Sequence, residues 1–241
     1  MRHLLFLLAL VTAAIKPAAA QKILEKSVDL AKGQRVFLEL PQASNIRVRA
    51  GASGKVMLKA SVNLNQNRLN DALLLEVEQA ADGVKLSSNL DYDMIRAAPP
   101  GDCPESIYYG DTYISYGKNG KRDASASRLC AVIDYEITVP AGTDLRVSTL
   151  SGNIDVAGLT GPLEAKSLSG FVDVAWPATQ GAELALKTIT GEVYTDQEIA
   201  FTSEPKKNPI VGYQLRGTLK GSGPLVKLES ISNDVYFRKR K

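Results

Sequence analysis

The sequence predicts an all-β protein in which a single-stranded parallel β-solenoid follows a less regular N-terminal β region. Two observations predict this fold. Four stretches of twelve residues share one pattern, and in each stretch apolar and polar residues alternate on both sides of a corner of small residues. Alternation with a period of two is typical of half-buried strands. The four copies occupy residues 145–156, 163–174, 184–195 and 226–237.

The corner of each copy consists of a hydroxyl residue, an apolar residue, a second hydroxyl residue, and then Gly or Asn. The fourth corner residues are Gly152, Gly170, Gly191 and Asn233. Because Gly and Asn tolerate positive φ best, the pattern predicts a left-handed residue at each corner. Equivalent residues of a solenoid stack about 4.8 Å apart, whereas in an antiparallel sandwich they would lie two strands apart and need not match. The matching corners therefore favour a solenoid with right-handed crossovers, and a degenerate copy is expected before the last one.

Residues 1–20 have the features of a secretory signal peptide. A basic start at Arg2 and His3 precedes the apolar residues 4–11, and Ala18-Ala19-Ala20 forms a cleavage site. The apolar run is too short to span a bilayer, and no later stretch predicts a transmembrane helix. We therefore expect an exported mature chain, located in the periplasm or at the cell surface.

Residues 21–140 predict the N-terminal β region. Alternation is visible in residues 23–62 and again in 131–139, while residues 71–80 fit either a strand or one short helix. Asp82-Gly83 is a turn dipeptide between two such segments. Residues 141–143 then turn into the regular repeats, which extend over residues 141–241.

Residues 91–130 form an insert without sustained periodicity, rich in Pro, Gly, Ser and Tyr. It contains the two cysteines of the chain, Cys103 and Cys130, which in an exported protein predict one disulfide that stabilises the fold by about 3 kcal/mol. The insert also carries a cluster of tyrosines, which we interpret as a binding loop for sugar rings or a protein partner. They are Tyr108, Tyr109, Tyr113 and Tyr116. The alternative is that these rings pack the insert against the solenoid.

Catalytic and cofactor chemistry is not predicted. The single histidine, His3, lies in the signal peptide, so a Ser-His-Asp or Cys-His mechanism is not expected. The cysteines lack the spacing and the histidine partners of a zinc site, and no Gly-rich phosphate loop precedes a helix. Asp155 and Asp173 are equivalent in adjacent copies and suggest a carboxylate pair or a Ca²⁺ site. Tyr194 and Tyr236 take that position in later copies, so we expect outward, solvated charges instead.

The mature chain is almost neutral, with 27 basic and 26 acidic residues, and this balance argues against a general nucleic-acid binder. Four of the basic residues end the chain at Arg238-Lys239-Arg240-Lys241. We interpret this tail as a solvated end that keeps the last coil from stacking on another molecule, with contact to anionic lipid or glycan as the alternative.

Several of these features together resemble a known family. The export signal, the strand entry at residues 135–140, the repeated Ser-Gly-x-Ile/Val-x-Val units and residues 217–225 before the last copy are similar to adhesin-like β-strand-repeat proteins of bacteria. These are the DUF4097, or toastrack, proteins. The resemblance covers most of the mature chain and implies β-solenoid stacks in the envelope, sometimes linked to membrane-stress signalling, without agreed catalytic residues. The insert between Cys103 and Cys130 departs from the family pattern, so no ligand-binding position is transferred.

These inferences predict a non-enzymatic, exported and adhesin-like envelope module that works by binding or as a scaffold. Its expected partner is an envelope protein or a glycan, and its oligomeric state stays open. One alternative is a cell-surface protein that binds or cleaves glycans. A second alternative is a scaffold partner of a membrane-stress sensing complex.

Overall fold

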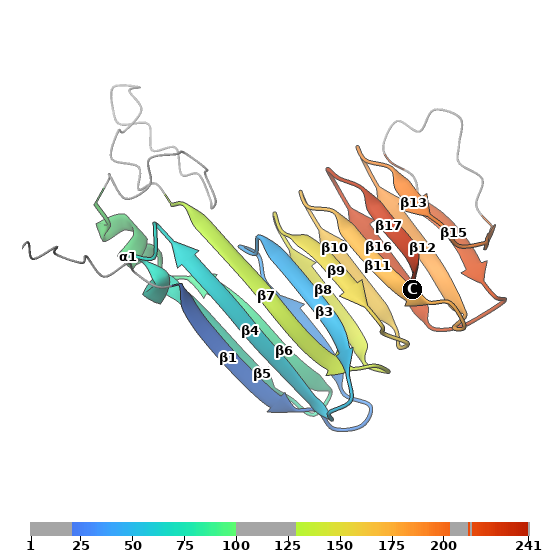
Figure 1. The fold of residues 1–241 in the computed structure, drawn as a ribbon, viewed down its shortest axis with the longest axis horizontal. Helices are drawn as coiled ribbons and strands as arrows, with labels where there is room; N and C mark the ends of the chain where they lie inside the picture. The colour runs from blue at the N-terminus through green and yellow to red at the C-terminus, as the bar shows by residue number, and fades with distance from the viewer. Residues whose placement is uncertain (1–20, 100–128, 203–211, 213, 241) are drawn as a thin grey trace, which may run out of the picture.

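The computed structural model describes residues 21–99, 129–202, 212 and 214–240 (Figure 1). Two large sheets enclose one apolar core, which extends along the described chain. Helical structure in this part is limited to the short helix α1 (Tyr92–Ala97) and the 3-10 turn η1 (Asn70–Ala72). The prediction of an all-β protein is therefore confirmed.

The strand order of each sheet departs from the order of the sequence. From edge to edge, the eight-stranded sheet contains β1 (Lys22–Asp29), β4 (Lys55–Leu64), β7 (Ala131–Pro140), β3 (Asn45–Gly51), β9 (Asn153–Ala157), β11 (Val172–Pro177), β17 (Val235–Arg240) and β13 (Val193–Thr195). The nine-stranded sheet contains β14 (Ile199–Phe201), β15 (Gln214–Leu219), β12 (Ala182–Thr188), β16 (Leu225–Ser230), β10 (Leu163–Ser167), β8 (Asp144–Thr149), β2 (Arg35–Glu39), β6 (Gly83–Leu90) and β5 (Leu73–Gln79).

Each repeat contributes one strand to each sheet, and we call such a pair of strands a rung. Equivalent strands of neighbouring rungs are parallel and in register, as in Leu145 beside Leu163 and Ile154 beside Val172. The strands β2 and β3 form an additional rung next to β8 and β9. The alternating sequence explains this arrangement, because every second side chain of a strand points into the core.

The expected single-stranded parallel solenoid is not confirmed, although equivalent strands of the repeats do pair in parallel. Both sheets are mixed, since β1 and β7 are antiparallel to β4, and β5 is antiparallel to β6. The other end of the nine-stranded sheet is mixed as well, because β15 is antiparallel to both β12 and β14. Residues 71–80, which fitted a strand or a helix, supply the end of η1 and the strand β5.

The last repeat lies inside the stack and not at its end. The rung β16–β17 is inserted between β10–β11 and β12–β13 (Figure 1). The expected degenerate copy is absent from the described residues before it, because β14 and β15 both belong to the nine-stranded sheet. The basic residues Arg238, Lys239 and Arg240 therefore lie in an interior strand beside β11, which corrects their interpretation as a free end of the stack.

The corners stack through a chain of hydroxyl hydrogen bonds. Gly170 N donates to Ser167 Oγ at 2.9 Å, and Ser167 Oγ donates to Gly152 O of the neighbouring rung at 2.8 Å. The same two bonds recur at the next two corners, where Ser230 and Thr188 take the place of Ser167. Each corner hydroxyl thus closes its own turn and holds the adjacent one, which accounts for the hydroxyl residue that begins every corner.

The predicted left-handed residue at each corner is wrong. The residues concerned are Gly152, Gly170, Gly191 and Asn233, and none of them is among the described residues with positive φ. Glycine is required at three of the four corners, those of Gly152, Gly170 and Gly191, because neighbouring rungs approach closely there. A Cβ atom on Gly170 would lie 2.1 Å from Gly152 O, and one on Gly191 would lie 2.3 Å from Asn233 O.

Candidate functional site

The outer face of the nine-stranded sheet is a ladder of ion pairs between neighbouring strands. Its closest pairs are Lys227–Glu164 at 2.7 Å, Arg35–Asp144 at 2.9 Å, Lys85–Glu39 at 2.9 Å and Lys187–Glu229 at 3.3 Å. Cross-strand pairs of opposite charge stabilise a sheet modestly and neutralise one another. Charges on this face are therefore largely satisfied within the chain.

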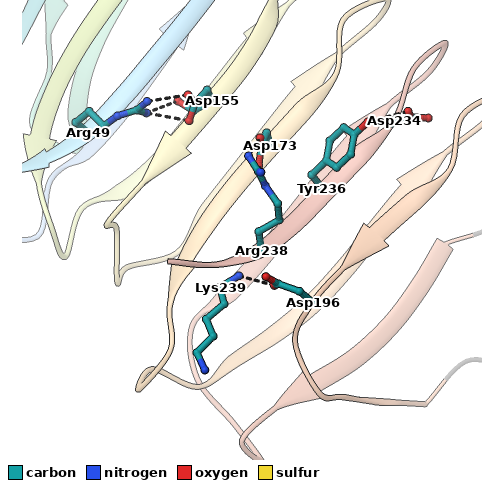
Figure 2. Close-up of polar contacts among 8 residues, drawn as sticks. All are labelled: Arg49, Asp155, Asp173, Asp196, Asp234, Tyr236, Arg238 and Lys239. Atoms are coloured by element: carbon teal, nitrogen blue, oxygen red, sulfur yellow. Dashed lines mark hydrogen bonds and ion pairs between the residues drawn. The ribbon is translucent and has the colours of Figure 1, made fainter. Parts of the chain in front are cut away.

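The outer face of the eight-stranded sheet combines ion pairs with aromatic rings. Arg49 on β3 forms two parallel bonds to Asp155 on β9, from Nη1 to Oδ1 at 2.9 Å and from Nη2 to Oδ2 at 2.7 Å (Figure 2). Nη1 of Arg49 also donates to the carbonyl oxygens of Val48 and Asp155. This bidentate geometry fixes the guanidinium plane against the sheet.

A second bidentate pair lies on the next two strands. Arg238 on β17 donates from Nε to Asp173 Oδ1 at 2.9 Å and from Nη2 to Asp173 Oδ2 (Figure 2). Hydrogen bonding to this carboxylate raises the pKa of Arg238 further above its ordinary value. Asp155 and Asp173 are register neighbours, as their place in the repeats suggested, but each of them binds its own arginine. Their charges point outward, and they are paired with arginine instead of being left to solvent.

Three aromatic side chains continue this face, and we call them the aromatic patch: Phe171, Tyr236 and Tyr194. The rings of Tyr194 and Tyr236 are stacked, with centroids 5.2 Å apart and planes inclined by 14°. Phe171 meets Tyr236 edge to face at 6.2 Å. Tyr194, on the edge strand β13, is 44% exposed, so one face of its ring has no neighbouring rung. Such rings supply contact area at low entropic cost.

Carboxylates hold both tyrosine hydroxyls of the aromatic patch. Tyr194 Oη donates to Glu192 Oε2 at 2.7 Å, and Tyr236 Oη donates to Asp234 Oδ2 at 3.0 Å. The bond to Glu192 raises the pKa of Tyr194 to about 12, and the bond to Asp234 raises the pKa of Tyr236. The rings are therefore fixed by polar contacts at their tips, and the ring of Tyr194 stays exposed while that of Tyr236 is half-buried.

Replacing Glu192→Gln should lower the pKa of Tyr194 from about 12 toward its ordinary value of 10.0, because the carboxylate that favours the protonated hydroxyl is lost. An ultraviolet titration of tyrosinate absorbance measures this change as a difference between wild type and variant. Burial raises the pKa of Tyr135 to about 12 as well, but that signal is common to both proteins and cancels. An unchanged titration would contradict the Tyr194–Glu192 hydrogen bond.

The raised pKa of Tyr194 also makes the stability of the folded protein depend on pH. The pKa of Tyr194 in the folded protein lies above the ordinary 10.0, so its contribution to stability is present below about pH 10 and is lost as the pH rises toward 12. The stability of the Glu192→Gln variant should therefore fall less steeply in this window.

A shallow depression of about 430 Å³ lies on the same face, over β1, β4 and β7. Glu25, Met57, Lys59 and Glu136 contribute to its lining. A second depression, of about 340 Å³, lies beside the corner residues Leu150 and Leu168. Within the described residues, no group of three or more His, Cys, Asp or Glu side chains is arranged to hold a metal ion.

Most of the predicted binding loop lies outside the described residues. This applies to Cys103, Tyr108, Tyr109, Tyr113 and Tyr116. Cys130 is described, and its backbone pairs with Asn65: Cys130 N donates to Asn65 Oδ1 at 2.8 Å, and Asn65 N donates to Cys130 O at 2.9 Å. The predicted disulfide and the role of the tyrosines stay predictions.

If Cys103 and Cys130 form the predicted disulfide, the exported protein should contain no free thiol. Alkylation under denaturing, non-reducing conditions, followed by mass spectrometry, should leave both cysteines unmodified until a reductant is added. Two alkylated cysteines in the unreduced sample would disprove the disulfide.

The sequence does not predict the aromatic patch as a unit. Tyr194 and Tyr236 occupy the position of the aspartates in the later copies, and the pattern gives no role to Phe171. The signal was available in the alignment of the copies, since equivalent positions of stacked rungs become neighbours across the sheet. What the alignment could not supply was the order of the rungs, which places Tyr236 between Phe171 and Tyr194.

Comparisons with known proteins add a similarity in structure. No family model and no curated protein matches the sequence. A "putative cell adhesion protein" of Clostridium sporogenes is 10% identical, with a TM-score of 0.49, and the match covers 92% of this chain and 100% of that chain. A "putative adhesin" of Bacteroides fragilis is 12% identical, with a TM-score of 0.35, and covers 90% and 98%. At these values neither structure identifies a function. Among the described residues, no helix has the length and apolar character that a membrane crossing requires.

Proposed function

We propose that this protein is an exported, non-enzymatic binding module of the bacterial envelope, and that the outer face of its eight-stranded sheet is the contact surface. The signal-like N-terminus and the resemblance to DUF4097 proteins support export and the adhesin-like class. The observation that carries the choice of face is the aromatic patch, because the opposite face is covered by ion pairs within the chain.

The physical argument concerns the cost of desolvation. Burying paired charges of the nine-stranded face under a partner would remove water from both partners of each pair with little new attraction. Burying Tyr194 and Tyr236 removes apolar ring surface from water, and their hydroxyls are already bonded to carboxylates. Tyrosine and arginine are also the residue types that contribute most to protein interfaces. Arg49 and Arg238 lie on the same face, but each is already paired with an aspartate, so the tyrosines carry the choice of face (Figure 2).

Glycan binding is the second candidate, favoured by one observation. The open ring face of Tyr194 lies close to the carboxylate of Glu192, and a sugar ring can stack on the former while its hydroxyls donate to the latter. The surrounding Glu192, Asp196 and Asp234 favour neutral or amino sugars over acidic ones.

Crosslinking in cells distinguishes these possibilities. We expect the double variant Tyr194→Ser and Tyr236→Ser to lose the partner that copurifies with the wild-type protein. Phe37→Ser is the matched control, because Phe37 is an aromatic residue on the opposite face, beneath the Arg146 guanidinium at 5.8 Å. Recovery of a glycan from the wild type would support the second candidate. An identical partner list from wild type and double variant would refute the assignment of this face.

A further inference from the structure

The two sheets end unevenly beside β13. The rung β12–β13 is the last that both sheets share, and the nine-stranded sheet continues with β15 and β14 (Figure 1). In the described chain, no strand of the eight-stranded sheet lies opposite these two. With strands about 4.8 Å apart, the step is about 10 Å wide. Within the described residues, the inward side of β14 and β15 therefore has no covering strand.

The inward side of this step is apolar and accessible. Ile199 pairs with Leu219 on β15, and Phe201 pairs with Gly217. Leu219 and Gly217 are buried positions on the core side of β15. Because paired residues lie on the same face of a sheet, the side chains of Ile199 and Phe201 also point to the core side. Phe201 is nonetheless 47% exposed, and Ile199 and Leu215 are half-buried. We call this surface the recess: Val193, Ile199, Phe201 and Leu215. A large inward-facing apolar ring that stays exposed indicates an unfilled position in the sandwich.

The free edge of β13 borders the recess. Val235 N donates to Glu192 O at 2.9 Å, and Glu192 N donates to Asp234 Oδ1 at 2.9 Å, so the backbone of Glu192 faces the β17 side. In a parallel ladder the backbone groups of successive residues alternate in direction. The N–H and C=O groups of Val193 and Thr195 therefore point away from β17, where the described chain places no strand. They offer hydrogen bonds to an added strand.

The charge of this edge specifies what kind of strand fits. Residues 192–202 contain Glu192, Asp196 and Glu198 but no Lys or Arg, and all three carboxylates are exposed. The open ring face of Tyr194 lies among them and attracts a cation. A basic side chain on the outward side of an added strand is therefore favoured, while an apolar side chain on its inward side would cover Phe201.

We propose that an extended segment of a partner protein, with basic and apolar residues in alternation, adds as a strand to β13 and covers the recess. This is strand addition at a sheet edge, in which backbone bonds supply affinity and alternate side chains supply specificity. The inference rests on the proposed function as a binding module and gives the class of partner: a protein with a basic, strand-forming segment.

A labelled, capped peptide of about seven residues that alternates valine and lysine is the probe, and fluorescence anisotropy with the mature protein is the measurement. We expect saturable binding that Phe201→Ser weakens about tenfold or more, because the apolar floor is lost. Ile23→Ser is the matched control, since Ile23 is 46% exposed against 47% for Phe201 and lies on the opposite edge strand, β1. Circular dichroism and melting verify that each variant is folded.

Two peptide controls separate strand addition from unspecific attraction. N-methylation of alternate backbone nitrogens removes the edge hydrogen bonds and should abolish binding, although the side chains are unchanged. Replacement of lysine by glutamate should weaken it. Equal binding of the methylated peptide, or no saturable binding at all, would overturn the proposal. So would self-association in sedimentation that Phe201→Ser abolishes, because a second copy would then be the occupant.

A different result, that of the Tyr236→Ser variant, would refute the proposed function. Tyr236 belongs to the aromatic patch and not to the recess, so Tyr236→Ser should leave peptide binding within a factor of about two while it impairs partner recovery in cells. Peptide binding without any effect of Tyr236→Ser on recovery would support the edge and refute the face.

Discussion

Gly170→Val should destabilise the protein by about 3 kcal/mol or more, which corresponds to a decrease in Tm of roughly 10 °C for a chain of this size. The reason is the close approach of two corners. Any Cβ on Gly170 would lie 2.1 Å from Gly152 O and 2.4 Å from Gly152 C, and both atoms belong to backbone that cannot rotate away. The variant must therefore separate two rungs or distort the hydroxyl chain through Ser167.

Gly142→Ala is the matched control for this prediction. Gly142 also lies at a turn between strands, but a Cβ there meets no atom within 4 Å, and its φ is not positive. Its free energy of unfolding should change by less than about 0.5 kcal/mol. Chemical or thermal denaturation measures both variants. Equal stability of Gly170→Val and wild type would contradict the observed stacking of the corners.

Removal of residues 225–241 should abolish cooperative folding. These residues form the rung β16–β17, which lies between two other rungs in both sheets. The side chains of Val226, Leu228, Val235 and Phe237 are completely buried. Each contributes about 1.5–3 kcal/mol by burial, and their sum is comparable with the 5–15 kcal/mol by which whole domains are stable. Truncation also leaves β12–β13 without the parallel neighbour to which both strands are bonded.

Removal of β1 provides the comparison, because β1 is an edge strand that is bonded only to β4. We expect this second truncation to stay folded, with a lower Tm and one cooperative transition. Far-ultraviolet circular dichroism and thermal melting distinguish the two outcomes. A folded protein after loss of residues 225–241 would show that the rungs close over the gap, and would contradict the rung order described above.

The sequence alone determined the strands and the corners. Alternation over residues 145–156 and its three copies predicted strands on both sides of each corner, and the structure has them. The hydroxyl residues and glycines of the corners also indicated that equivalent positions are in contact. The predicted reason for the corner glycines, a positive φ, was wrong. A glycine that allows close approach of two rungs and a glycine that adopts positive φ look the same in the sequence.

Only the tertiary structure decided the order of the rungs, the mixed sheets and the aromatic patch. Alternation is a local property that fixes which face of a strand is buried, whereas the neighbour of a strand is chosen by contacts between segments far apart in the chain. Because all copies carry the same pattern, the pattern does not indicate which copies are neighbours in the sheets. The pairing of Val226 with Leu163 was therefore not predictable from it. The insertion of the last rung brings Tyr236 beside Tyr194, and the two strands β14 and β15 leave the step beside β13. Both candidate contact surfaces therefore arise from long-range packing, which no repeat contains by itself.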